Sequence, residues 1–101
     1  MTRQELINMF VANYAMDLRD AKSLAIRNIE LHARLMNGIV TFVYTKSDGS
    51  ERTAVGTLFE PMLPEIKGTG KPLKEDLQVY FDIEKQSFRC FKKANLVSIK
   101  N

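Results

Sequence analysis

The residues best suited to chemistry are basic and aromatic side chains near the end of the chain. Five basic residues and no acidic one lie between residues 85 and 101, whereas residues 39–84 carry five basic and eight acidic side chains. A cationic segment can bind anions, because a guanidinium offers phosphate a planar fork of donors and lysines add sequence-independent affinity. The candidate residues for binding a ligand or nucleic acid are Arg89, Lys92, Lys93, Tyr80, Phe91 and Arg52.

Each of these candidates also has a structural interpretation that requires no ligand. Arg89 is expected opposite Asp82 in a hairpin, where a cross-strand ion pair is complete by itself, although pairing and ligand contact can coexist. Exposed rings between cations can stack on bases, but Tyr80 and Phe91 are buried instead if a helix packs on their face. Adjacent lysines in a turn are commonly just solvated. The sequence leaves both interpretations open.

Catalytic and metal sites are not expected. The chain has one histidine, His32, and one cysteine, Cys90, and its carboxylates are scattered. Cys90 is expected to face the core as a small buried hydrophobe, and His32 falls on the apolar stripe of a predicted helix. Gly68-Thr69-Gly70-Lys71 lacks the spacing of a phosphate-binding loop, and no helical pattern follows it. We therefore predict a protein that is not an enzyme and has no catalytic residues, metal or cofactor.

Length and composition limit the remaining classes. A chain of 101 residues with 45% hydrophobic and 27% charged residues is predicted to form one globular domain. No apolar run is long enough to span a bilayer, and Glu5 and Asn8 interrupt any signal-peptide core, so no membrane partner is expected. A single cysteine suits a reducing cytoplasm, which is the predicted location.

The N-terminal segment, residues 1–38, is predicted to form two helices. Thr2 and Glu5 have the spacing of a capping box, and Asp17 is the predicted N-cap of the second helix. Asn37-Gly38 is expected to end that helix, since glycine tolerates a left-handed C-cap. The predicted apolar stripes are Leu6, Ile7, Phe10, Val11 and Tyr14 in the first helix, and Leu18, Ala21, Ala25, Ile29, His32 and Met36, widened by Leu24, Ala33 and Leu35, in the second.

From residue 39 onward the pattern is that of β-strands. Runs rich in β-branched and aromatic residues predict strands at 39–46, 51–58, 77–83, 88–91 and 96–99, with a single turn at 92–95. All three prolines lie in a loop at 59–76. A two-residue loop at Asp48-Gly49 would place Phe42 opposite Val55, whereas a bulged three-residue loop would shift that register.

The second predicted hairpin sets the direction of the candidate side chains. With Lys85-Gln86 as its loop, Asp82 lies opposite Arg89, and Tyr80 lies opposite Phe91. These four side chains share the face that is predicted to point to solvent. The alternating residues of the predicted inward face are Leu77, Val79, Phe81 and Ile83, opposed by Phe88 and Cys90. Five short antiparallel strands leave exposed edges unless the sheet closes, which predicts a small barrel beside the helical pair.

Several short motifs make the strand region comparable with a known family. They are Val40-Thr41-Phe42-Val43-Tyr44 with Asp48-Gly49 and Arg52, Val79-Tyr80-Phe81-Asp82, and Phe88-Arg89-Cys90-Phe91 followed by Leu96 and Ile99. With these motifs, residues 40–99 resemble the Sm-like SH3 β-barrel of WYL domains, and most closely a small stand-alone WYL-like family catalogued as a bacterial domain of unknown function. Asp76-Leu77-Gln78 stands where WYL domains have Trp-Tyr-Leu, and Lys92 stands where they usually have arginine.

The resemblance implies a fold and a class of ligand. The expected fold is α+β, with an N-terminal helical pair (1–38) and a five-stranded antiparallel SH3-like barrel (39–101) in a single domain. WYL domains sense nucleotide or nucleic-acid ligands through a basic surface, and Arg89 matches the arginine of their motif. We therefore predict a binding module for nucleic acid or a nucleotide-like anion. The alternative is a protein-interaction or homo-oligomerisation module that uses the broad apolar second helix.

Overall fold

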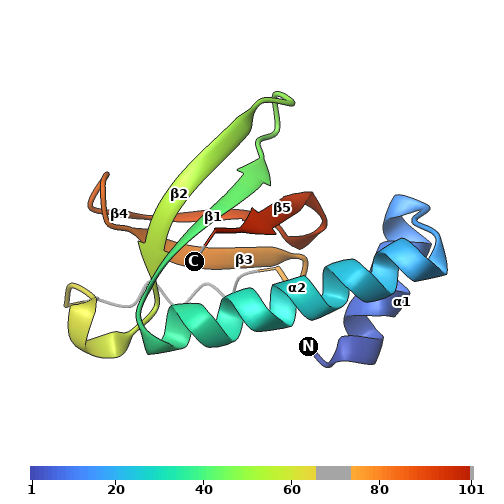
Figure 1. The fold of residues 1–101 in the computed structure, drawn as a ribbon, viewed down its shortest axis with the longest axis horizontal. Coiled ribbons are helices and arrows are strands. Elements are labelled where there is room, and N and C mark those ends of the chain that lie inside the picture. The colour runs from blue at the N-terminus through green and yellow to red at the C-terminus, as the bar shows by residue number, and fades with distance from the viewer. Residues whose placement is uncertain (66–73, 101) are drawn as a thin grey trace.

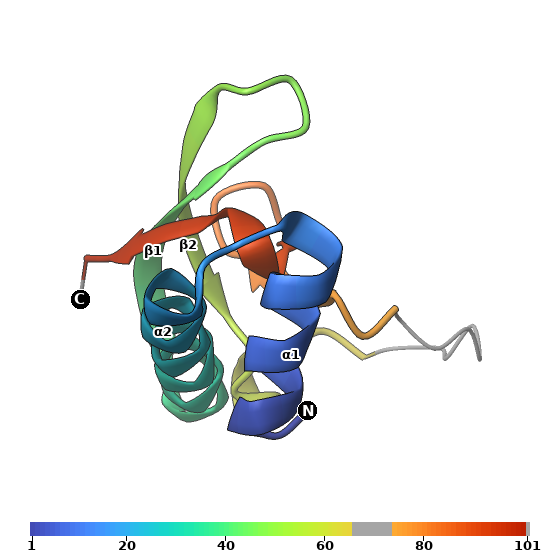
Figure 2. The ribbon, with the colours of Figure 1, turned by 90° about the vertical axis from the view of Figure 1, so that its right-hand side faces the viewer.

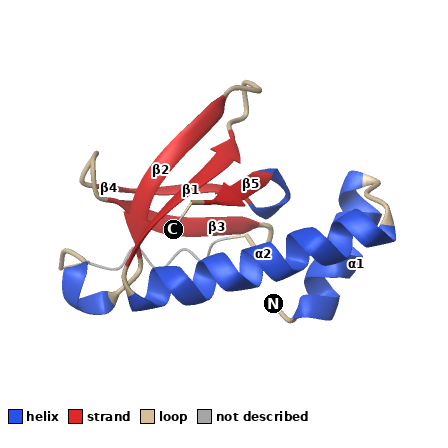
Figure 3. Ribbon diagram, in the orientation of Figure 1, coloured by secondary structure: helices blue, strands red, loops and turns tan. Residues whose placement is uncertain are grey.

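The computed structural model describes residues 1–65 and 74–100, so the Gly68–Lys71 motif lies outside the described residues. Two helices precede a five-stranded antiparallel sheet, as predicted (Figure 1; Figure 3). The elements are α1 (Arg3–Tyr14), α2 (Leu18–Asn37), β1 (Ile39–Thr45), β2 (Glu51–Thr57), the 3₁₀ turn η1 (Glu60–Met62), β3 (Leu77–Asp82), β4 (Ser87–Lys92), the 3₁₀ turn η2 (Lys93–Asn95) and β5 (Leu96–Ile99).

Both predicted helix starts are confirmed by their caps. The Thr2 hydroxyl accepts the backbone N–H of Glu5 at 3.1 Å, and the Glu5 carboxylate accepts the backbone N–H of Thr2 at 2.9 Å. The Asp17 carboxylate accepts the backbone N–H of Asp20 at 2.8 Å. These contacts satisfy donors that have no partner within a helix. The left-handed cap occurs after α1, at Ala15 (φ 52°), whereas Gly38 after α2 is extended.

The buried face of α2 differs from the predicted stripe. Leu24, Leu31 and Leu35 are buried together with Ala21 and Ala25. By contrast, the predicted stripe residues Leu18, Ile29, His32 and Met36 are exposed. Apolar residues cover more than half of the circumference of this helix, so its sequence does not decide which part meets the sheet. Figure 2, turned by 90°, shows α1 beside α2, and buried Leu6 and Phe10 of α1 belong to the same core cluster as the α2 leucines.

The first hairpin has the three-residue loop that the sequence left open. Thr45 pairs with Glu51 and Phe42 with Ala54, which is the register of the bulged alternative. The Lys46 backbone N–H donates to the Ser50 carbonyl at 2.7 Å, and Gly49 closes the turn with φ 89°. A bulged loop of this kind needs a left-handed residue at its end, and glycine adopts that conformation without a steric cost.

The second hairpin is shifted by two residues from the predicted register. Tyr80 lies opposite Arg89 and Val79 opposite Cys90, because the loop holds four residues, 83–86, instead of two. A shift of two residues leaves each side chain on the same face of the hairpin as predicted. The face that was predicted to point to solvent, however, is the one that points to the core. Tyr80 and Phe91 are buried in the main core, whereas Cys90 and Phe88 are exposed. For Tyr80 and Phe91 the structure thus shows the buried alternative, and the prediction that Cys90 faces the core is wrong.

The sheet curls toward a barrel because its two edges are joined by one short turn. The strand order is β4-β3-β2-β1-β5, so β4 and β5 are opposite edges. The edges of a flat five-stranded sheet are about 19 Å apart, whereas three residues of 3₁₀ helix rise about 6 Å. The turn Lys93–Asn95 can therefore connect the edges only if the sheet is rolled. Within the described residues β4 and β5 are not paired, so the curled sheet is not closed.

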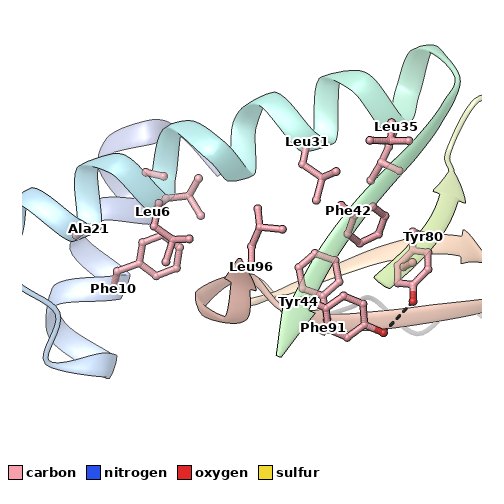
Figure 4. Close-up of a cluster of buried hydrophobic side chains, with 14 of the residues drawn as sticks. Leu6, Phe10, Ala21, Leu31, Leu35, Phe42, Tyr44, Tyr80, Phe91 and Leu96 are labelled. Atoms are coloured by element: carbon pink, nitrogen blue, oxygen red, sulfur yellow. Dashed lines mark hydrogen bonds between the residues drawn. The ribbon is translucent and has the colours of Figure 1, made fainter. Parts of the chain in front are cut away.

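Aromatic rings fill the interior of this curled sheet. Figure 4 shows Phe42, Tyr44, Tyr80 and Phe91 gathered between the strands, with Leu31 and Leu35 of α2 and Leu96 of β5 against them. The Tyr44 and Phe91 rings are stacked, with centroids 4.6 Å apart and planes inclined by 12°. Such ring pairs contribute both buried area and a favourable geometry.

No helix among the described residues is long and apolar enough to cross a membrane.

Candidate functional site

The most distinctive polar group of the fold is a buried carboxylate, Asp82, held by two arginines. It lies at the end of β3 and is fully buried. Arg52 of β2 places its Nη2 2.6 Å from Asp82 Oδ2, and Arg89 of β4 places its Nε 3.5 Å from the same oxygen. The other carboxylate oxygen accepts the backbone N–H of Lys85 at 2.9 Å. A buried charge needs such compensation, because desolvation alone is strongly unfavourable.

These contacts keep the carboxylate ionised. Burial by itself raises the pKa of Asp82, but the backbone N–H of Lys85 and the hydrogen bond and charge of Arg52 outweigh it, so the net pKa is below its usual value. The hydrogen bond to Asp82 raises the pKa of Arg52. Two guanidinium groups therefore share one carboxylate, and the cluster carries one net positive charge.

Arg89 contacts this cluster through one nitrogen of its guanidinium. Its Nε faces Asp82, and the side chain is 41% exposed. Within the residues that the structure describes, neither terminal nitrogen of Arg89 makes an ion pair or a hydrogen bond. The cross-strand ion pair that the sequence suggested is therefore present in a different register, and in the described chain it leaves both terminal nitrogens without a protein partner.

A groove of about 420 Å³ lies beside Arg89. One wall is the end of β1 with its turn, residues 45–48, and the other is residues 89–92 of β4 together with Asn95. The groove lies between the end of β1 and the edge strand β4. Lys46, Arg89 and Lys92 contribute three positive charges to its lining. Asp48 contributes the negative charge of the described lining; it bonds Ser50 at 2.6 Å and lies 4.0 Å from Lys46.

The outer edge of β4 also presents backbone groups to solvent. The Lys93 N–H bonds the Asp76 carbonyl, which places the β3–β4 hydrogen bonds at alternate residues and directs the N–H and C=O groups of Phe88, Cys90 and Lys92 away from β3. No strand of the described chain pairs with this edge. Neighbouring lysines are a common feature of such edges, where they discourage pairing with another sheet.

The predicted site residues separate into four groups, of which Lys93 forms the last. Arg89, Lys92 and Phe91 line the groove, although Phe91 contributes a ring that is 4% exposed. Arg52 is linked to the groove through Asp82. Tyr80 lies beneath it, and its hydroxyl is 2.8 Å from that of Tyr44. Burial is the main reason that the pKa of Tyr80 is raised.

Lys93 lies outside the groove. Its Nζ donates to the Glu75 carbonyl at 2.7 Å and its backbone N–H to the Asp76 carbonyl at 2.8 Å. Burial lowers the pKa of this ammonium, although Glu75 and Asp76 oppose the shift. The predicted pair of turn lysines is thus divided, with Lys92 at the groove and Lys93 anchoring the chain before β3.

Sequence reasoning missed seven of the ten described residues that line the groove, among them Lys46 and Tyr44. Lys46 follows the first strand directly, beside the predicted Asp48-Gly49 turn, and this position is the signal in the sequence that points to a residue lining a groove. Tyr44 alternates with Phe42 in that strand, which predicted a shared face but gave no sign of a groove. Cys90 also lines the groove and is a free, exposed thiol. Among residues 1–65 and 74–100, no group of three or more His, Cys, Asp or Glu side chains is placed to hold a metal ion.

Comparison with known proteins agrees with this architecture. A family model described as WYL_2, Sm-like SH3 β-barrel fold, matches residues 28–97. The chain belongs to the WYL_2 family. The matched region starts within α2 and contains all the strands up to β5, so the second half of α2 is part of the WYL_2 unit.

The chain is also similar to a phage protein. Over 89 residues it is 36% identical to the uncharacterized 11.5 kDa protein in the Gp31-cd intergenic region of Enterobacteria phage T4, covering 83% of this chain and 86% of the phage protein. The similarity therefore covers most of both chains. No solved structure matches the chain.

Proposed function

We propose that this WYL_2 chain is a non-enzymatic binding module for nucleic acid or a nucleotide-like anion, acting in the cytoplasm through the groove beside β4. The observation that carries the proposal is the arrangement of Arg89, which lines a groove with Lys46 and Lys92 and whose terminal nitrogens have no protein partner in the described chain. Three cations against one carboxylate favour an anionic ligand. The volume of about 420 Å³ falls in the range of small-molecule sites.

The burial of the aromatic rings changes the mechanism expected from the sequence. Tyr80 is inaccessible to solvent and Phe91 is almost completely buried. Bases therefore cannot stack on these two rings, as the sequence suggested they could if the rings were exposed. Binding would instead rely on contacts to phosphate, which position a nucleic acid but carry no sequence information. The proposed module therefore binds without preference for a particular sequence.

Titration of fluorescent single-stranded DNA and RNA at several salt concentrations tests the proposal. Three phosphate contacts predict that log Kd changes with log salt with a slope of about 2. Arg89→Ala and Lys92→Ala should each weaken binding and reduce that slope by about 0.7. Lys22→Ala, which removes an exposed lysine of α2 away from the groove, is the matched control and should bind normally. The proposal is wrong if no binding occurs at low salt or if binding is indifferent to Arg89.

A second candidate function is homo-oligomerisation through α2. The supporting observation is an exposed apolar stripe on this helix, next to the face that packs on the sheet: Leu18, Ile26, Ile29 and Met36. A contiguous apolar patch on a small protein is typical of an interaction surface. Sedimentation over a wide concentration range would show a dimer that Ile29→Asp disrupts and that Ser23→Asp, an exposed position outside the stripe on α2, does not. A monomer at every concentration would exclude this candidate.

A further inference from the structure

Asp82 contacts the exposed Arg89 and the partly buried Arg52 through the same oxygen atom. The distances are 3.5 Å to Arg89 Nε and 2.6 Å to Arg52 Nη2. We infer that Asp82 is a positioning residue, which fixes the Arg89 guanidinium so that its terminal edge meets two oxygens of one phosphate group. This inference rests on the proposed function and names the chemical group that the groove recognises.

The geometry of the guanidinium supports this role. Nε and the two terminal nitrogens lie in one plane, so a contact at Nε fixes the direction in which the terminal pair points. That pair can donate two parallel hydrogen bonds to a phosphate, and prior orientation lowers the entropic cost of forming them. The backbone of Lys85 holds the other oxygen of Asp82, so the carboxylate that orients Arg89 is itself fixed.

Charge balance explains why the ion pair does not cancel the attraction for an anion. Arg52 is the closer partner, and its side chain is 19% exposed. It neutralises Asp82 within the protein interior, where the interaction is least screened. The charge of Arg89 therefore remains available in the groove, next to Lys46 and Lys92. Without Arg52, Asp82 and Arg89 would form a neutral pair.

The ligand group that this arrangement fits is a phosphate, with recognition independent of the base. The floor of the groove is made of Tyr44 and Phe91, which are stacked on each other, and each ring is about 5% exposed or less. No base can stack on a face that is already covered. A free nucleotide, inorganic polyphosphate and a nucleic-acid backbone all provide the same phosphate chemistry, and competition between them distinguishes the sources.

The test separates positioning from charge. Arg89→Lys keeps the positive charge but has neither the Nε contact nor the fork, so it should bind a fluorescent oligo-dT at least fivefold more weakly than the unchanged protein while its salt slope stays the same. Asp82→Asn should weaken binding to a similar extent with the charge of Arg89 intact. Oligo-dA and oligo-dC should bind like oligo-dT. ATP and inorganic tripolyphosphate serve as competitors, and whichever displaces the DNA at the lower concentration is the closer mimic of the ligand.

A spectroscopic measurement makes the test independent of folding effects in Asp82→Asn. The Arg89 Nε–H resonance, assigned by its loss in Arg89→Lys, should be resolved in the free protein and should shift when inorganic tripolyphosphate is added. If Arg89→Lys binds as well as the unchanged protein, or if oligo-dA and oligo-dT differ strongly, the positioning inference is overturned while the proposed function stands. If no oligonucleotide binds to the unchanged protein, both are overturned.

Discussion

Gly56 of β2 lies directly against the ring of Tyr80 in β3. A Cβ atom built on Gly56 would be 2.6 Å from Cδ2 of that ring and 3.2 Å from the Phe81 carbonyl oxygen. Tyr80 cannot move aside easily, because its ring is fully buried against Phe42 at a centroid distance of 5.0 Å. The absence of a side chain at position 56 therefore allows the tyrosine to enter the core next to the Asp82 cluster.

Gly56→Ala should lower the free energy of unfolding by about 1–3 kcal/mol, the usual cost of overpacking a filled core. Gly38→Ala is the matched control, since nothing lies within 4 Å of a Cβ at that position and its backbone is extended. Urea denaturation of the three proteins measures the effect. Equal stability of Gly56→Ala and Gly38→Ala would show that the Tyr80 ring is not fixed against β2.

The buried hydroxyl pair of Tyr44 and Tyr80 should contribute to stability as a unit. The two oxygens are 2.8 Å apart, and removal of either hydroxyl leaves the other without this partner. Tyr44→Phe and Tyr80→Phe should each cost about 1–2 kcal/mol. The double variant should cost less than the sum of the single changes, because no hydroxyl is then left unpaired. Strict additivity in a double-mutant cycle would contradict the pairing.

The local features of the fold were predictable from the sequence. The caps at Thr2 and Asp17 depend on residues three positions apart, so short-range chemistry determines them completely. The Asp48-Gly49 turn was located for the same reason, and its three-residue form was one of two open alternatives. The order of the elements along the chain and the barrel architecture followed from counting strands and from the resemblance that the WYL_2 match confirms.

The orientation of the second hairpin was not predictable in the same way. Alternation along β3 shows that Tyr80 and Asp82 share a face, but it does not show which face is the interior. Asp82 made that face look polar, and a charged residue in a strand is normally expected on the face exposed to solvent. Its burial depends on Arg52, which is 30 residues away and becomes a neighbour only after β2 and β3 pair. Long-range ion pairing therefore reversed an expectation based on local pattern.

The pKa of Asp82 predicts how stability depends on pH. Its folded-state pKa is below its usual value, so the unfolded chain binds the proton more readily. The stabilisation is complete above the unfolded pKa of about 4 and is lost as the pH falls through the lower folded value. Asp82→Asn should be less stable near neutral pH, and the difference from the unchanged protein should shrink between about pH 4 and pH 2. Glu5 and Asp48 have lowered pKa values in both proteins, so comparing the two removes their contribution. A constant difference across this range would contradict the ionised buried state.

Asn28 should couple α2 to the turn between β4 and β5. Its Nδ2 donates to the Leu24 carbonyl one turn earlier and to the Lys93 carbonyl of η2, both at 3.0 Å, from a position that is 4% exposed. Asn28→Ala leaves the Lys93 carbonyl without this donor and should lower the free energy of unfolding by about 1–3 kcal/mol. Asn37 makes the same contact to a carbonyl four residues earlier, Ala33, but is exposed and bonds nothing beyond its own helix in the described chain, so Asn37→Ala should cost less than about 0.5 kcal/mol.

Because η2 also carries the chain from the groove wall at Lys92 to β5, Asn28→Ala should increase hydrogen exchange at residues 92–96 more than in α1. Equal stability of the two alanine variants, or unchanged exchange in that turn, would show that α2 and η2 are held together without Asn28.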